Sequence, residues 1–293
     1  MQSTPKSHQE IPSTMEVQPN PPIVPAPAAA VTQPNNDIIL KITTQRNASS
    51  KLTTRLLSIV TAAFANDDTF GWRYPNRKTY PSHFRRLFWR YLGAELLNPS
   101  VWVVVAYLRD ENEEEIPVGY ATWQRMGKGA MEETEVKWRD CWLQSTERLL
   151  FSLQERVTSF VSPIDCYKPA VNLMRESFKE TEHYLATTPQ FEKYLHLNIL
   201  VVDPSYQRRG IGEALVKWGV KKARKDNIPS ALEASVAGKK VYSKCGFEEM
   251  RVLDAYHPDV ANGGVWREGM HCRDPDCKFA KGTFMTFDPR IQS

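Results

Sequence analysis

The stretch from residue 195 to residue 226 limits the possible folds of this chain more than any other. Its first part, LHLNILVV (195–202), is an apolar run with the length and composition of a strand. Its last part, residues 209–226, has the apolar spacing of an amphipathic helix. Between them lie an Asp-Pro stop, two arginines and a Gly-Ile-Gly start to the helix. A strand that passes directly into a helix in this way predicts a mixed α/β fold.

The glycines and arginines of this junction predict an anionic ligand. Helix N-termini carry unpaired N–H groups and a partial positive charge, which together bind phosphate. Gly210 and Gly212 allow close approach of the backbone, and Arg208 and Arg209 add charge. A Rossmann dinucleotide site fits poorly, because Leu215 stands where the third glycine belongs, and a Walker loop lacks its Gly-Lys-Ser/Thr. The alternative without a ligand is a glycine-containing helix start with solvated arginines.

Strand and helix patterns alternate on both sides of this junction. The predicted strands are residues 38–44, 101–108, 118–124, 195–202, 229–235, 246–254 and 282–287. The predicted helices are residues 49–65, 80–97, 131–161, 170–186, 209–226 and 238–245, and NDDTFGWRYPN (66–76) is expected to be a loop. In the helix 131–161 the period places Val136, Leu149, Leu150, Leu153 and Val157 inward. This order predicts an α/β (α+β) fold with strands on both sides of the central strand–helix unit.

Composition divides the chain into a tail and a domain. Residues 1–36 contain eight prolines, no glycine and no aromatic residue, so we expect a disordered tail. Residues 37–293 are expected to form one domain, with 131–194 as a helical insertion between two strands.

Charge and cysteine content narrow the class of protein. The net charge of +4 is too small to predict a nucleic-acid partner by itself, although residues 203–225 hold a surplus of five positive charges. No apolar run approaches the length of a membrane span and no leader is visible, so we expect no membrane partner and a cytoplasmic location, with the nucleus left open. Cysteines at 141, 166, 245, 272 and 277 are scattered and odd in number, against a disulfide framework. His271, Cys272 and Cys277 lack a second ligand pair, so no metal site is expected.

Three linked motifs resemble the GNAT superfamily of acetyl-coenzyme A-dependent N-acetyltransferases. Gln207-Arg208-Arg209-Gly210-Ile211-Gly212 is similar to its Q/R-x-x-G-x-G/A motif. Val202-Asp203-Pro204 and Tyr242-Ser243-Lys244-Cys245-Gly246-Phe247 resemble its V-x-P and Y-x-x-x-G-F elements, in the same order and spacing. The resemblance covers residues 195–254, extends more loosely to 37–293, and is greatest to fungal members with a long helical insertion. It implies a twisted, mostly antiparallel sheet of about six to seven strands with a splayed central strand, flanked by helices.

The same resemblance implies acetyl-CoA as co-substrate, with no metal. The backbone of Leu200, Val201 and Val202 would pair with the pantetheine arm like an added strand. The pyrophosphate would bind the signature segment and the helix start, that is, Gln207, Arg208, Arg209, Gly210, Ile211, Gly212 and Glu213. Ser235 stands where the family often has an asparagine that touches the cofactor, and Tyr242 would also contact it.

Acetyl transfer from a thioester to an amine needs a base for the amine proton and a donor for the departing thiolate. Tyr242 occupies the family's general-acid position; a core tyrosine on a short helix is the alternative. His196 lies where relatives place a catalytic Glu or His, and its ordinary pKa suits a proton relay. A locally bonded strand histidine, Glu233 as base, or water remain open. Alternation along the strand predicts that every second residue from His196 to Val202 shares one face.

The sequence thus predicts an N-acetyltransferase that acts on the primary amine of a small molecule by direct attack in a ternary complex. Acetylation of a protein lysine or N-terminus is the alternative among enzymes, and a non-catalytic acyl-CoA-binding module is the alternative outside them. An acetyl-cysteine at Cys245 is not the usual route in the family. Trp138 and Trp142 of the insertion would line the acceptor site or pack within a helical hairpin.

Overall fold

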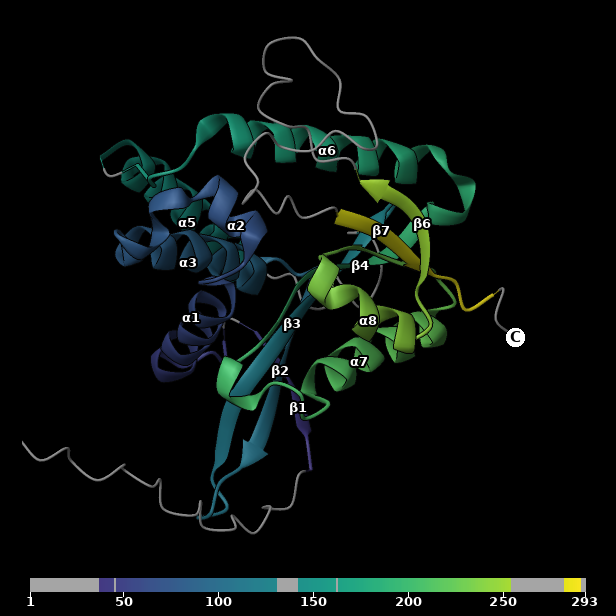
Figure 1. Ribbon diagram of the computed structural model, residues 1–293, viewed down its shortest axis with the longest axis horizontal. Coiled ribbons are helices and arrows are strands. Elements are labelled where there is room, and N and C mark those ends of the chain that lie inside the picture. Colours follow the sequence, from purple (N-terminus) through teal and green to yellow (C-terminus); the bar gives the residue numbers. More distant parts are fainter. Residues whose placement is uncertain (1–36, 45, 131–141, 162, 254–281, 291–293) are drawn as a thin grey trace, which may run out of the picture. The chain divides into compact units, whose positions relative to one another are not determined.

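A seven-stranded mixed sheet organises the structure. The computed structural model describes residues 37–44, 46–130, 142–161, 163–253 and 282–290, which belong to one unit spanning Asn35–Ser293. The strands are β1 (Ile39–Thr43), β2 (Val101–Arg109), β3 (Glu115–Gly127), β4 (Lys193–Val202), β5 (Ser230–Ala234), β6 (Glu248–Leu253) and β7 (Gly282–Phe287). Their order is β1-β2-β3-β4-β5-β7-β6, and every neighbouring pair is antiparallel except β4 and β5 (Figure 1). The predicted fold class and strand count are therefore confirmed.

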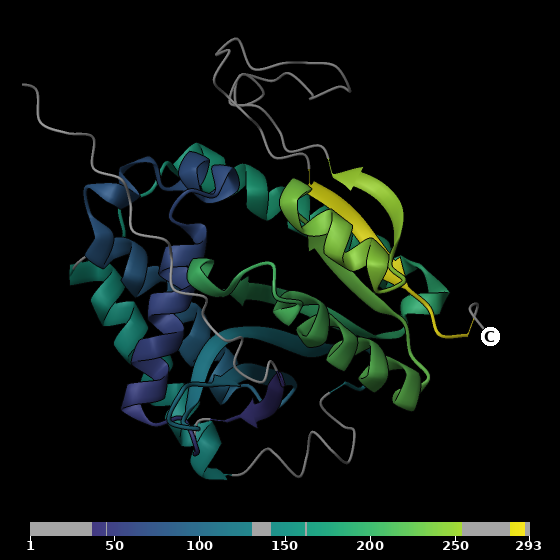
Figure 2. The ribbon, with the colours of Figure 1, turned by 60° about the horizontal axis from the view of Figure 1, so that its bottom comes forward.

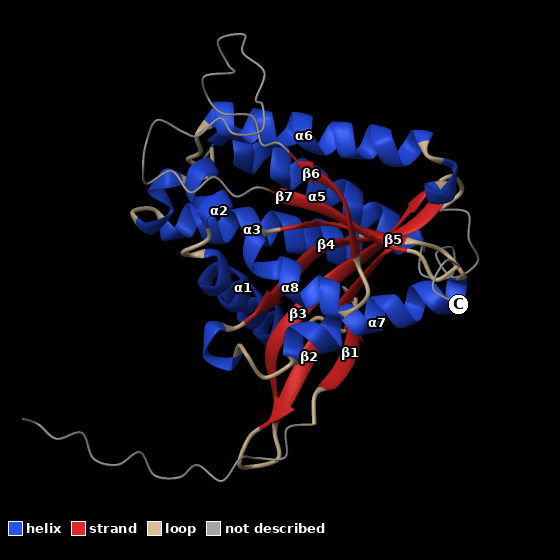
Figure 3. Cartoon of the chain, turned by 45° about the vertical axis from the view of Figure 1, so that its right-hand side comes forward, coloured by secondary structure: helices blue, strands red, loops and turns tan. Residues whose placement is uncertain are grey.

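Helices cover both faces of this sheet (Figures 2 and 3). They are α1 (Ser50–Phe64), α2 (Asp68–Arg73), α3 (Pro81–Leu97), α5 (Trp142–Val161), α6 (Lys168–Thr187), α7 (Ile211–Asp226) and α8 (Val236–Lys244). The loop expected at 66–76 contains α2, because the Asp67 side chain caps that helix at the amide of Phe70 and Phe70 packs against Phe64 and Phe88. No helix within the described ranges is long and apolar enough to cross a membrane.

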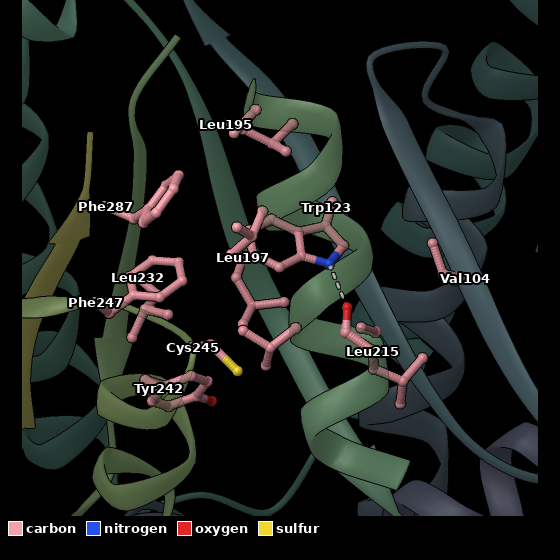
Figure 4. Close-up of a cluster of buried hydrophobic side chains, with 14 of the residues drawn as sticks. Val104, Trp123, Leu195, Leu197, Leu215, Leu232, Tyr242, Cys245, Phe247 and Phe287 are labelled. Atoms are coloured by element: carbon pink, nitrogen blue, oxygen red, sulfur yellow. Dashed lines mark hydrogen bonds between the residues drawn. The ribbon is translucent and has the colours of Figure 1, made fainter. Parts of the chain in front are cut away.

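Alternate strand residues build two cores, one on each face. Trp102, Val104 and Trp123 face α7, where Trp123 packs against Leu215 of that helix (Figure 4). Their neighbours, such as Val103, Val105 and Tyr120, face α1 and α3. The sheet is therefore buried on both sides, which explains the continuous apolar runs in the sequence.

A bulge interrupts β4 at Asn198. Thr122 of β3 pairs with Ile199, but the next residue, Trp123, pairs with Leu197, so Asn198 is the extra residue. Beyond it Ile199 and Val201 pack on the α1 and α3 side, whereas Leu200 and Val202 pack on the α7 side. The predicted shared face from His196 to Val202 is therefore wrong, because an inserted residue reverses the alternation.

The central strand also parts from its neighbour. β4 pairs with β5 over Leu195–Leu197 and Ser230–Leu232, although both strands continue beyond these pairs. From Asn198 to Val202 no described strand lies beside this edge of β4. The splayed central strand implied by the family resemblance is confirmed.

Helix α5 does not bury the stripe that its period predicts. Leu149, Leu150, Leu153 and Val157 are 60%, 65%, 47% and 64% exposed, and Val136 lies outside the described residues. α5 instead meets α3 through another stripe, because Phe151 packs on Trp89 at 5.2 Å between ring centroids and Glu155 pairs with Arg90. An amphipathic period identifies helical residues but does not decide which of two adjacent stripes is buried.

Candidate active site

The segment predicted to bind an anion, the cradle, lies between β4 and the start of α7. β4 ends at Val202, and the carboxylate of the next residue, Asp203, accepts from the amide of Ser205 at 2.9 Å and pairs with Arg55 at 2.6 Å. Arg208 and Gly210 then take left-handed backbone conformations, with φ of 66° and 81°. Gly210 is the N-cap and no side chain caps the helix, so the first amides of α7 are left to an outside acceptor. A Cβ built on Gly210 meets nothing within 4 Å, so the approach is open.

The charged side chains around this cradle leave a net positive surface. Arg208 and Arg209 are exposed, and the Arg209 guanidinium lies over the Tyr206 ring at 5.1 Å. The carboxylate of Glu213, in the first turn of α7, pairs with Lys217 at 2.7 Å. The arrangement suits a phosphate group, because uncapped amides and two exposed arginines lie close together in the chain while the nearby carboxylate is paired with a lysine.

The open edge of β4 lies directly before the cradle. The amide of Asp203 donates to the carbonyl of Val118 in β3 at 2.8 Å. Because backbone groups alternate in direction along a strand, the amides and carbonyls of Val202 and Leu200 point away from β3. The carbonyl of Val202 accepts from the side chain of Gln207 at 3.2 Å. The remaining edge groups have no strand partner within the described part of the chain and can pair with an extended ligand.

His196 and Glu233 form an ion pair across the two parting strands. His196 Nε2 lies 2.9 Å from Glu233 Oε2, and each side chain is less than one fifth exposed. Burial alone would lower the pKa of His196, but the charge and hydrogen bond of Glu233 raise it above its ordinary value. Burial would raise the pKa of Glu233, and His196 lowers it overall. Each partner therefore favours the charged form of the other.

A second group of polar side chains holds the other nitrogen of His196, and sequence reasoning missed it. His196 Nδ1 lies 2.8 Å from Oδ1 of the bulge residue Asn198. The Asn198 amide donates to Glu95 Oε1 at 3.3 Å and to Gln124 Oε1 at 3.1 Å. Because the Asn198 oxygen can accept but not donate, Nδ1 carries a proton. The network thus fixes the tautomer of the imidazole.

Glu95 at the base of this network is an unusual carboxylate. Its Oε1 also accepts from the Thr122 hydroxyl at 2.7 Å, while its buried Oε2 has no hydrogen-bond partner among the described residues. Burial raises the pKa of Glu95 to about 7, against the lowering effect of the bonds from Thr122 and Asn198. No local pattern marks Glu95, which joins the site from α3.

Tyr242 lies on α8 on the opposite face of the sheet. Its ring covers Gly238, where an added Cβ would be 2.8 Å from Cε2, and it meets Phe247 edge-on at 6.2 Å between centroids. Figure 4 shows its hydroxyl, and the sulfur of Cys245, directed toward the α7 side. Burial raises the pKa of Tyr242 well above its ordinary value, so the hydroxyl stays protonated. Burial also raises the pKa of the Cys245 thiol, which makes it a weak nucleophile.

The parting of β4 and β5 therefore has a different candidate group on each face. Glu233 and Ala231 of β5 face α6 together with His196, whereas Leu232 and Ala234 belong to the core that contains Tyr242. Ser235, predicted to contact the cofactor, follows β5 and caps α8 by accepting from the amide of Gly238 at 3.2 Å.

Two adjoining cavities lie on the α6 side of this gap. The first, of about 320 Å³, is lined by Met126, Phe178, Thr181, Glu182, Leu185, Tyr194, His196, Asn198 and Glu233. The second, of about 540 Å³, shares Met126, Glu182 and Tyr194 with the first and reaches Lys128 and Glu192. A small molecule in the first cavity would be in contact with the His196–Glu233 pair.

Some predicted features lie outside the described residues. Trp138 is one of them, as are His271, Cys272 and Cys277, and the side chain of Trp142 is not described. Within the described ranges, no group of three or more His, Cys, Asp or Glu side chains could hold a metal ion.

Comparison with known proteins gives several matches. The chain is 26% identical over 222 residues to an acetyltransferase of Stachybotrys chartarum, covering 72% of this chain and 84% of that one. A solved structure from Corynebacterium glutamicum, described as histone acetyltransferase HPA2 and related acetyltransferase, is 18% identical with a TM-score of 0.47, covering 86% and 96% of the two chains. A solved structure described as mosquito arylalkylamine N-acetyltransferase like 5b is 15% identical with a TM-score of 0.42, covering 86% of this chain and 100% of that one. Residues 178–249 match the family model described as acetyltransferase (GNAT) domain.

Proposed function

We propose that this chain, in which residues 178–249 match a GNAT acetyltransferase domain, is an acyltransferase. It transfers the acetyl group of acetyl-CoA to the primary amine of a small molecule by direct attack in a ternary complex. Bound acetyl-CoA supplies a thioester, at whose carbonyl carbon the amide C–N bond forms as the C–S bond breaks. The protein's contribution is to bind both substrates at the gap between β4 and β5 and to move two protons.

The fit of acetyl-CoA rests on the α7 junction and the β4 edge. The uncapped amides from Ile211 to Glu213, with Arg208 and Arg209, bind the pyrophosphate. The amide and carbonyl of Leu200 and the amide of Val202, which face away from β3, pair with the pantetheine arm, as an added strand would. Pairing of this kind would bring the thioester toward the start of the splay, where β4 leaves β5.

The base is assigned to the His196–Glu233 pair. The amine arrives protonated and must lose a proton before its nitrogen can attack. His196 accepts it through Nε2, because Nδ1 already donates to Asn198, and Glu233 stabilises the resulting imidazolium. Because Glu233 raises the pKa of His196, a protonated His196 must first lose its own proton to solvent before it can act as the base.

The acid is assigned to Tyr242. Its hydroxyl lies on the α7 face, is protonated at all physiological pH values because burial raises its pKa, and donates to the departing sulfur. Acid and base then act from opposite faces of the sheet, so neither neutralises the other.

One observation carries the proposal: β4 parts from β5 after Leu197, one residue beyond His196, so that an open strand edge, the His196–Glu233 pair and a cavity lie close together. A cavity of about 320 Å³ favours a small acceptor over a folded protein surface. The free thiols of Cys166 and Cys245 suit the reducing conditions of the cytoplasm, where we expect the reaction to occur.

The test is thiol release from acetyl-CoA with a panel of polyamines, arylalkylamines, amino acids and peptides. We expect release with small amines, and silence across all of them would contradict the proposal. Release with peptides alone would favour the protein-directed alternative. Direct attack also predicts sequential kinetics, in which both substrates bind before CoA leaves, and initial-rate measurements can distinguish this from a ping-pong pattern.

Replacing Tyr242→Phe tests the acid. We expect kcat to fall by about 100-fold or more while the affinity for CoA is kept, because the hydroxyl is needed only by the departing sulfur. Tyr80→Phe, at an exposed tyrosine at the start of α3, is the matched control. If the chain is instead a non-catalytic acyl-CoA-binding module, then the unaltered protein, Tyr242→Phe and Tyr80→Phe would all release no thiol and would bind CoA with equal affinity.

A further inference from the structure

The cavity beside His196 contains one carboxylate that the proposed reaction does not use. Glu182 on α6 lines both cavities, so it lies where a molecule held at His196 would extend toward the second cavity. The other carboxylate of the first cavity, Glu233, is already paired with His196 at 2.9 Å. Glu182 has no such partner: no lysine or arginine in the described part of the chain pairs with it.

The negative charge of Glu182 extends into the cavity. After burial, it is the largest cause that raises the pKa of Tyr194 to about 12, and it adds to the raised pKa of His196. In the second cavity the carboxylate of Glu192 lies 3.9 Å from Lys128, so its charge is largely matched there. The surplus charge of the two cavities is therefore the one at Glu182, at the place where they join.

The wall between Glu182 and the His196–Glu233 pair is apolar. Met126, Leu185 and Tyr194 line it, and Leu185 and Tyr194 are 2% and 5% exposed. Such a wall accepts a hydrocarbon chain but offers little to hydroxyl or carboxylate groups along it. The cavity thus has the His196–Glu233 pair at one end of an apolar passage and the carboxylate of Glu182 at the other.

We propose that the acceptor is an aliphatic diamine, whose reacting nitrogen lies at the His196–Glu233 pair and whose second ammonium binds Glu182. This inference rests on the proposed function and names the substrate class of the same site. Glu182 acts here as a specificity-determining residue. It holds the end of the acceptor that keeps its charge throughout the reaction.

A matched pair of acceptors tests the proposal in the intact protein. Putrescine and n-pentylamine have the same number of heavy atoms and differ in one terminal group, an ammonium in place of a methyl. We expect kcat/KM for putrescine to exceed that for pentylamine by about tenfold or more, since a hydrogen bond to a charged group contributes on that scale. Glu182→Gln should abolish this preference, chiefly by raising KM for putrescine.

Glu176→Gln is the control variant, because Glu176 is an exposed glutamate on the same helix that pairs with Lys179 and does not line either cavity. The putrescine preference should survive in it. Equal loss in both variants would show a diffuse effect of helix charge and would contradict a role for Glu182. Equal use of the two amines by the unaltered protein would overturn the diamine class and leave the proposed function standing. If no amine is acetylated, the proposed function itself fails.

Discussion

At the scale of single residues, the His196–Glu233 pair determines how the site responds to pH. The pKa of His196 is raised and that of Glu233 is lowered, so each partner stabilises the charged form of the other. The contribution of Glu233 to folding is present above its ordinary pKa of 4.5 and is lost as the pH falls through its lower folded value. The contribution of His196 is full below 6.5 and is lost as the pH rises through its higher folded value. Both contributions are present between pH 4.5 and pH 6.5, the ordinary pKa values of the two side chains, so the pair stabilises the fold most in this range.

Catalysis needs the opposite state of His196, and this gives a prediction. Because the imidazole must be neutral to accept a proton, kcat/KM should rise with pH through a pKa above 6.5. Glu233→Gln removes the charge that raises this pKa, so the acidic limb of the pH–rate profile should move to lower pH. The change should be visible in profiles of kcat/KM measured with saturating acetyl-CoA.

Glu114→Gln, in the exposed turn between β2 and β3, is the control for charge alone and should leave the limb in place. An unchanged limb in Glu233→Gln would show that another group is the base. Glu95 would then be the first candidate, because its carboxyl titrates at about 7 beside Asn198.

At the scale of elements, hydrophobic period predicted which segments are strands and helices, because each long element buries one side or both. The strand 101–108 and the helix 209–226, for example, correspond to β2 (Val101–Arg109) and α7 (Ile211–Asp226). The bulge at Asn198 could not be predicted, since nothing in LHLNILVV differs from an ordinary strand and the bulge depends on pairing with β3. The same limit hid Glu95, which reaches Asn198 from a helix about a hundred residues earlier in the chain.

Short motifs indicated candidate site residues that period could not, because their glycines and polar groups have local geometric roles. The left-handed conformation of Gly210 at the start of α7 is such a role. No short sequence motif marks the residues that line the cavity proposed for the acceptor. Its residues, such as Glu182, Tyr194 and Glu233, come from three elements and meet through packing of α6 on the sheet.

Packing between α7 and β3 gives a prediction at this scale. A Cβ added at Gly219 would lie 2.2 Å from the indole of Trp123, which is fully buried and donates to the carbonyl of Leu215. Gly219→Ala should therefore lower the free energy of unfolding by about 1–3 kcal/mol, although alanine favours a helix by about 1 kcal/mol over glycine. Urea denaturation measures the difference.

Gly212→Ala provides the comparison for stability, because it makes the same change on the same helix where a Cβ would meet Val202 at 3.8 Å. Its stability should be unchanged or slightly higher. If Gly219→Ala is as stable as Gly212→Ala, then Trp123 moves freely and the close contact does not hold α7 to the sheet.

At the scale of the whole folded unit, the gap between β4 and β5 leaves backbone groups without partners, and a ligand that pairs with them should increase the stability of the fold. Between Asn198 and Val202 the backbone groups on the β5 side of β4 have no partner strand in the described residues, and the amides at the start of α7 have no side-chain cap. An extended ligand with a pyrophosphate would join β4 to α7 across the gap. Binding to the folded state alone then adds to its stability.

This gives a prediction for thermal unfolding. At about 100 times its Kd, CoA should stabilise the unit by about 2.7 kcal/mol, which raises Tm by several degrees, at roughly 2–4 °C for each kcal/mol in a chain of this size. Gly210→Ala should reduce that rise, because its φ of 81° is strained for a residue with a side chain and the cradle amides would turn away. Pantetheine lacks the pyrophosphate, so its smaller rise should be the same in both proteins. If Gly210→Ala reduces the Tm increase caused by pantetheine as much as the one caused by CoA, the variant has altered the β4 edge as well. The assignment of the pyrophosphate to the helix start and of the pantetheine arm to the strand edge would then be wrong.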